Sequence, residues 1–185
     1  MNYCFFDTGL STEDEEYDIQ GADYEELIRK CFQYSEYFSV WFSPHVQWTE
    51  KLKLYEITVD PACFEYAPPY APHPQDKGDI MIYLHFYCIC PELYQLLIEN
   101  MHSIWDGWNY DQPSYMHFYR SDGTCFFMCN AHDGICTFFA QDGEDVSSVV
   151  SKEHWYPETD LAPNVIWSPR PRVYRPLMQE KPSNV

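Results

Sequence analysis

Apolar residues recur along this chain with two periods, one typical of helices and one typical of strands. Between positions 24 and 35 they lie three or four residues apart, and acidic side chains precede them where the helix dipole favours negative charge. A second run of this kind spans residues 93–104, directly after Pro91, which suits a first helical turn. We therefore predict two main amphipathic helices.

Alternating or continuous apolar runs predict the strands. These runs cover residues 38–42, 52–59, 79–90, 115–120, 124–129 and 135–140. Asp-Gly turns at 122–123 and 133–134 separate the last three runs, as in antiparallel hairpins. The expected fold is therefore a single α+β domain, with an antiparallel sheet of five or six strands and both main helices on one face.

Prolines gather in two segments that are expected to lie outside the regular elements. Residues 66–74 contain four prolines and cannot form a helix or an inner strand. Six more prolines follow Trp155. We expect residues 1–160 to form an acidic α+β domain and residues 161–185 to form a proline-rich, mildly basic, extended tail.

Negative charge is the strongest compositional signal. The chain has 29 Asp and Glu residues against 11 Lys and Arg, a net charge of −18, and residues 1–160 alone carry −21. This surplus disfavours direct binding to nucleic acid and to anionic membranes. It favours a basic protein partner instead, because opposite charges accelerate encounter.

The sequence is typical of a cytoplasmic protein with free thiols. No run approaches the roughly 18 apolar residues of a membrane span, and residues 1–7 lack the basic and apolar regions of a signal peptide. Eight cysteines in 185 residues fall below the density of secreted disulfide scaffolds.

Candidate catalytic chemistry is sparse. Cys129, His132 and Cys136 flank one hairpin turn and offer at most three zinc ligands, whereas structural zinc takes four. Phosphate-binding glycine loops, nucleophile elbows and His-Glu-x-x-His motifs are absent from the sequence. We expect no cofactor and no enzymatic activity, although a metal- or thiol-dependent enzyme of unknown reaction stays open as an alternative.

Carboxylates with aromatic residues nearby are the remaining candidate for function. Spread over a domain of this size, they approach the charge of the phosphates along a similar length of duplex DNA. The residues expected to contact a partner are Glu13, Asp14, Glu15, Glu16, Asp18, Trp105, Asp106, Trp108, Tyr110, Asp111, Asp142, Glu144 and Asp145.

The combination of small size, acidity and aromatic richness is similar in type to two classes of protein. One comprises inhibitors of nucleic-acid enzymes, such as anti-CRISPR and anti-restriction proteins, and the other comprises immunity proteins that neutralise bacterial toxins. The resemblance assigns no residues. We expect a small inhibitor that partly mimics nucleic acid and binds the basic groove of a nuclease or CRISPR effector, with an immunity protein as the alternative.

Overall fold

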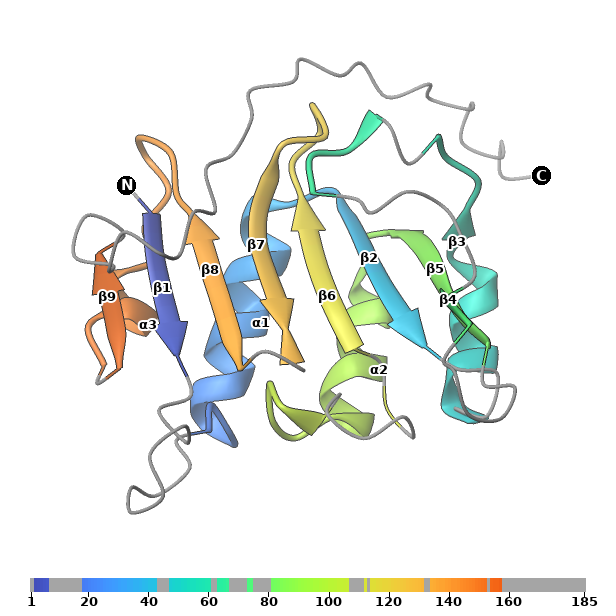
Figure 1. Ribbon diagram of the computed structural model, residues 1–185, viewed down its shortest axis with the longest axis horizontal. Helices are drawn as coiled ribbons and strands as arrows, with labels where there is room; N and C mark the ends of the chain where they lie inside the picture. Colours follow the sequence, from blue (N-terminus) through green and yellow to red (C-terminus); the bar gives the residue numbers. More distant parts are fainter. Residues whose placement is uncertain are drawn as a thin grey trace.

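A computed structural model gives the arrangement of the chain (Figure 1). It describes residues 2–6, 18–42, 47–60, 63–66, 73–74, 81–106, 112, 114–131, 134–152 and 154–157. Helices and strands both occur, so the expected α+β class is confirmed. The proposed tail, residues 161–185, lies outside the described residues.

A long antiparallel sheet forms the front layer of the molecule (Figure 1). The strands are β1 (Asn2–Phe6), β2 (Tyr37–Phe42), β3 (Glu56–Ile57), β4 (His73–Pro74), β5 (Met81–Cys88), β6 (Ser114–Tyr119), β7 (Cys125–Asn130), β8 (Ile135–Phe139) and β9 (Trp155–Pro157). Eight of them follow the order β3-β5-β2-β6-β7-β8-β1-β9, and β4 pairs with β5 beside this path. The described pairings are all antiparallel.

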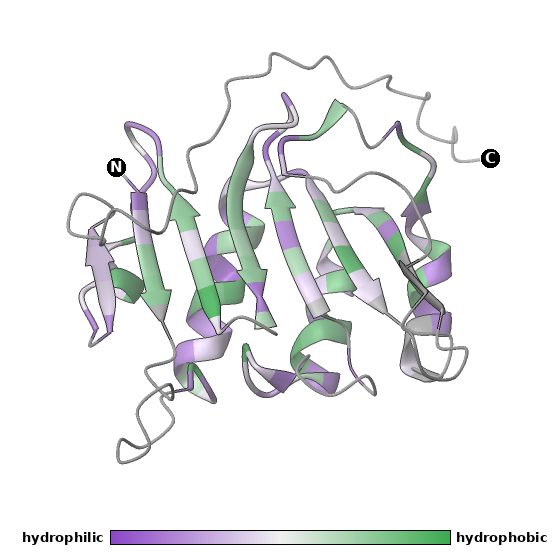
Figure 2. Ribbon diagram, in the orientation of Figure 1, coloured by the Kyte–Doolittle hydropathy of each residue, from purple (hydrophilic) through white to green (hydrophobic). Residues whose placement is uncertain are grey.

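The helices pack behind the sheet, as Figure 1 shows. They are α1 (Ala22–Tyr34), α2 (Pro91–Asn100), the short α3 (Ser147–Val150) and the 3-10 helix η1 (Gln47–Leu54). Side chains one helical turn apart on α1, including Tyr24, Leu27 and Ile28, are buried against Phe118 and Phe127 of the sheet. In Figure 2 green, hydrophobic segments run along the central strands. The main core therefore lies between the helices and this face of the sheet.

A second hydrophobic cluster covers part of the opposite face of the sheet. Cys63 and Phe64 pack there against Tyr119 and Cys125, at the end where β6 turns into β7. Gly123 occupies this turn with φ +83°, and a Cβ at this position would lie 2.5 Å from the Cys63 carbonyl oxygen. Only glycine fits there without a shift in the backbone.

The sheet is larger than the five or six strands expected, and this prediction was wrong. Three strands were not predicted: β1, with five residues, β9, with three, and β4, which lies in the proline-rich segment 66–74 that was expected to stay outside the regular elements. Residues 52–59 were expected to form one strand, yet only Glu56 and Ile57 pair in the sheet. Trp48, Leu52 and Tyr55 instead face the core at helical spacing from η1 and the residue that follows it.

None of the helices in the described part of the chain has the length and apolar character that crossing a bilayer requires. The eight cysteines form no disulfide, and six of them are buried. This arrangement agrees with the expectation of free thiols.

Candidate functional site

The chain that leads into α1 is joined to the chain that leaves α2. The amide of Gly21 donates a hydrogen bond to the carbonyl of His102, and the amide of Ile104 donates one to the carbonyl of Ile19, at 3.1 and 3.0 Å. These bonds bring two segments about 80 positions apart in the sequence against each other. The acidic residues at the start of α1 consequently lie beside those that follow α2.

A pair of carboxyl groups, Asp18 and Asp106, results from this junction. Asp106 accepts hydrogen bonds from the backbone amides of His102 and Ser103, at 2.6 and 3.2 Å, which fix its position. Burial raises the pKa of Asp18 above its usual range, and the charge of Asp106 raises it further, against the opposing effect of the Ser103 hydroxyl. Hydrogen bonds from the amides of Ile19 and Trp105 also lower the pKa of this carboxyl, but its buried Oδ1 has no hydrogen-bond partner among the described residues. Asp18 is therefore an acid that the fold holds in an unfavourable setting.

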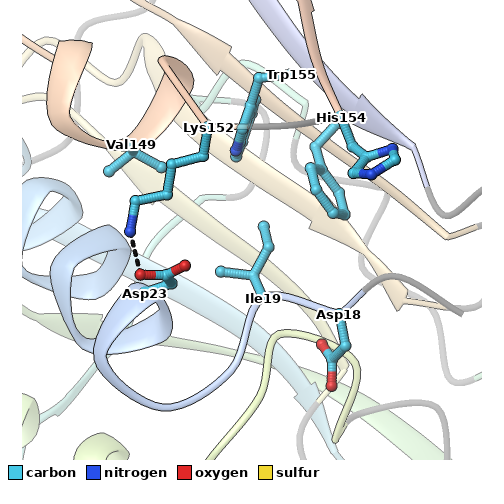
Figure 3. A pocket seen from close by; sticks show the side chains of 8 residues that line it. Asp18, Ile19, Asp23, Val149, Lys152, His154 and Trp155 are labelled. Carbon is cyan, nitrogen blue, oxygen red and sulfur yellow. Dashed lines mark hydrogen bonds and ion pairs between the residues drawn. The ribbon is translucent and has the colours of Figure 1, made fainter.

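A pocket opens beside this carboxyl pair, with a volume of about 270 Å³ (Figure 3). Its lining comes from β1, the start of α1, α3 and the chain around β9. The lining residues are Phe5, Asp18, Ile19, Asp23, Val149, Lys152, His154 and Trp155. In Figure 3 the Asp23 carboxylate lies on one side of Ile19 and Asp18 on the other, and a dashed line joins Lys152 to Asp23.

Aromatic rings form one wall of the pocket. Phe5 is central to them, with ring centroids 5.3 Å from Trp155, 6.0 Å from Trp105 and 6.3 Å from His154. Pairing of β1 with β9 places Phe5 directly opposite Trp155. The pocket therefore combines aromatic surface with two carboxyl groups, and this combination suits a cationic ligand.

The described cations are largely engaged with acids of the same chain. The ion pairs join Arg29 to Glu26, Lys30 to Asp145, Lys53 to Glu50, Arg120 to Glu144 and Lys152 to Asp23. Acids outside these pairs include Asp18, Glu25, Glu36, Glu92, Glu99, Asp106 and Asp142. They lie on both long helices and on turns at both ends of the sheet. The group at the start of α1 is distinguished by its carboxyl pair and by its pocket.

Three of the predicted contact residues meet at this site. Asp18 and Asp106 form the carboxyl pair, and Trp105 packs on Phe5, which lines the pocket. Seven others lie outside the described residues: Glu13, Asp14, Glu15, Glu16, Trp108, Tyr110 and Asp111. In the sequence they stand directly before Asp18 and after Asp106.

The other predicted group, in the loop after β8, lies apart from the pocket and supports the fold. Glu144 accepts two hydrogen bonds from the Arg120 guanidinium, at 2.7 and 2.6 Å. The Asp145 carboxylate lies 3.8 Å from the buried Lys30 ammonium and accepts a hydrogen bond from the Ser147 amide. Asp142 is exposed. Contact of these three residues with a partner stays a prediction, and the structure gives two of them an internal role.

The candidate zinc and thiol residues lie in the core. Cys129 and Cys136 are directly opposite each other on β7 and β8, and both are buried, whereas His132 lies outside the described residues. Burial, together with the Cys129 thiol, raises the pKa of Cys136 well above its usual range, which disfavours the thiolate that a nucleophile or a metal site needs. Within the described ranges, no group of three or more His, Cys, Asp or Glu side chains could hold a metal ion.

Sequence reasoning missed most of the pocket. No local motif marks the lining residues Phe5, Ile19, Val149, Lys152, His154 and Trp155. They come from β1, the start of α1, α3 and the chain around β9, and the pairing of β1 with β9 brings Phe5 to Trp155. Charge patterning could indicate the acids. It could not indicate which aromatic side chains lie beside them.

No protein-family model matches the chain, and searches among curated proteins and solved structures find no match either. Function is therefore inferred from the chemistry of the site.

Proposed function

We propose that this protein is a small cytoplasmic inhibitor that binds the basic nucleic-acid-binding groove of a nuclease, with a CRISPR effector as the preferred partner. Its net charge of −18 favours rapid encounter with a cationic cleft. Within the described residues, five of the six Lys and Arg side chains pair with acids of the same chain. Carboxylates outside these pairs are therefore available to a partner's cations.

One observation carries the proposal: the hydrogen-bonded junction of residues 19–21 with 102–104 places Asp18 where the charge of Asp106 acts on it, in a partly buried position that raises the pKa of Asp18. A carboxylate in such a setting reduces the stability of the isolated fold. A partner's Arg or Lys beside this pair would relieve the repulsion and supply the hydrogen bond that Asp18 Oδ1 lacks within the described residues. The unfavourable arrangement therefore suits complementarity to a cation that the partner brings.

Binding to purified enzymes tests the proposal. The protein would be immobilised and exposed to a panel of CRISPR effector complexes and toxin nucleases, with the dissociation constant measured from 50 to 500 mM salt. We expect one class of enzyme to bind, with an affinity that falls at least about tenfold over this range, because screening shortens the reach of charge–charge attraction. Binding that is insensitive to salt would contradict the proposal, and capture of toxin nucleases alone would identify an immunity protein instead.

Matched variants locate the contact. Asp18→Asn and Glu25→Gln each remove one negative charge from the start of α1, and Glu36→Gln removes one from an exposed position beyond its other end. The first two variants are expected to weaken binding several-fold, and Glu36→Gln is expected to bind like the unaltered protein. Equal effects of all three would mean that net charge alone governs binding.

A further inference from the structure

The pocket beside the carboxyl pair already holds a cation from its own chain. The side chain of Lys152 passes between Val149 and Trp155, and its ammonium group contacts the Asp23 carboxylate (Figure 3). The contact is partly open to solvent, because 42% of the Lys152 side chain and 50% of the Asp23 side chain are exposed. An ion pair this exposed contributes little stability, so another cation can replace Lys152 at small cost.

The lining of the pocket favours a flat cation. In Figure 3 the rings of Trp155 and His154 lie on one side of the pocket, and the carboxyl groups of Asp23 and Asp18 lie on the other. Phe5, whose ring packs against both of those rings, also lines the pocket. A guanidinium group is planar, is weakly hydrated, stacks on aromatic rings and can bind a carboxylate through two hydrogen bonds. An ammonium group offers a compact, strongly hydrated charge and makes less use of the rings.

An anionic ligand fits the same pocket poorly. Lys152 is balanced by Asp23, and the neighbouring Asp18 and Asp106 add negative charge. The acidity of the whole chain strengthens this local preference.

We propose that this pocket receives an arginine side chain of the partner, whose guanidinium displaces Lys152 from Asp23 and stacks against the aromatic wall. The inference rests on the proposed function, since it names the chemical group through which the basic partner is held. The pocket acts as the anchor point of the interface, where one buried arginine contributes more than the surrounding charges.

Titration with small probes tests the pocket without any partner. Isotopically labelled full-length protein would be titrated separately with three probes: N-acetyl-arginine amide, N-acetyl-lysine amide and the neutral isostere N-acetyl-citrulline amide. The shifts of the Trp155 indole N–H and of the Ile19 methyl groups report binding at this site. We expect weak, saturable binding of the arginine probe, at least about fivefold weaker binding of the lysine probe, and no saturation with the citrulline probe.

Variants separate the pocket from general charge. Asp23→Asn is expected to weaken the arginine probe about tenfold, because it removes the carboxylate of a charge-assisted pair. Lys152→Ala removes the internal competitor and is expected to strengthen binding several-fold, whereas Glu36→Gln leaves binding unchanged. Spectra of each variant check that the fold is intact.

Two results would overturn the inference: equal shifts with the arginine and citrulline probes, or equal affinity in Asp23→Asn and Glu36→Gln. Tighter binding of the lysine probe would overturn the choice of arginine. These outcomes are independent of enzyme capture. If the protein captures an enzyme but binds no arginine probe, only the arginine pocket is rejected. If it binds the probe but captures no enzyme, the proposed function is rejected.

Discussion

The ion pair of Arg120 and Glu144 offers the sharpest test of how the fold is stabilised. The two side chains are only 11% and 13% exposed, and both guanidinium–carboxylate hydrogen bonds are short. Glu144 also accepts the amide of Gln141 at 2.7 Å, and Arg120 donates to the carbonyls of Cys125 and Phe139. This pair therefore ties the β6–β7 turn to the loop after β8.

Glu144→Gln removes the negative charge and keeps the shape of the side chain. Loss of one partner of a buried ion pair typically costs about 3–5 kcal/mol. Here glutamine retains one acceptor, and the two carbonyls continue to bind Arg120. We therefore expect the free energy of unfolding to fall by about 2–3 kcal/mol, as measured by urea denaturation at pH 7. The control Glu50→Gln breaks the exposed pair with Lys53 and should cost less than about 0.5 kcal/mol.

Lowering the pH should abolish the difference between Glu144→Gln and the unaltered protein. Burial alone would raise the pKa of Glu144, but hydrogen bonds from Arg120 and from the Gln141 amide outweigh it and hold the pKa below its usual value. A carboxyl whose pKa is lower in the folded than in the unfolded state adds stability above the unfolded pKa of about 4.3. It loses that stability as the pH falls through the folded pKa. Equal stabilities of the two proteins at pH 7, or a difference that persists at pH 2–3, would refute this reasoning.

Three further substitutions or titrations follow from the structure. Gly123→Ala is expected to cost about 2–4 kcal/mol in urea denaturation, because φ is +83° and the new Cβ would overlap the Cys63 carbonyl oxygen; a loss below 0.5 kcal/mol would contradict the geometry. Asp18→Asn should raise the urea midpoint at pH 7. Burial and the charge of Asp106 raise the pKa of Asp18, so its ionised form is unfavourable in the folded state. An unchanged or lower midpoint would contradict this. Burial lowers the pKa of His117 to about 4. Between about pH 6.5 and 4 the unfolded chain therefore binds one more proton than the folded chain, and the free energy of unfolding falls as the pH drops through that window. An NMR titration that shows His117 protonated near pH 6.5 would exclude this contribution.

Local periodicity and turn chemistry were sufficient to predict much of the fold. The apolar spacing of residues 24–35 is that of α1, and the Asp-Gly turns mark the hairpins that join β6, β7 and β8. These signals are local, because a helix face or a tight turn is encoded within a few residues. The number of strands was not predictable in this way, since β1 is stabilised by pairing with both β8 and β9, and β9 by pairing with β1.

The candidate site shows the same division between local and non-local information. The acidic character around Asp18 and Asp106 is visible in the sequence, but their proximity depends on the pairing of residues 19–21 with 102–104. The aromatic wall depends on contact between Phe5 and Trp155, which lie 150 positions apart. No pattern within one segment encodes either contact.

Competition with nucleic acid is the most direct measurement of the central claim. The enzyme captured in the binding assay would be loaded with fluorescently labelled nucleic acid, and the unaltered protein, Asp18→Asn and Glu36→Gln would each be titrated in while release of the label is followed. The account predicts that the protein and the nucleic acid exclude each other, that Asp18→Asn competes several-fold less well, and that Glu36→Gln competes fully. A stable ternary complex of enzyme, nucleic acid and this protein would contradict it.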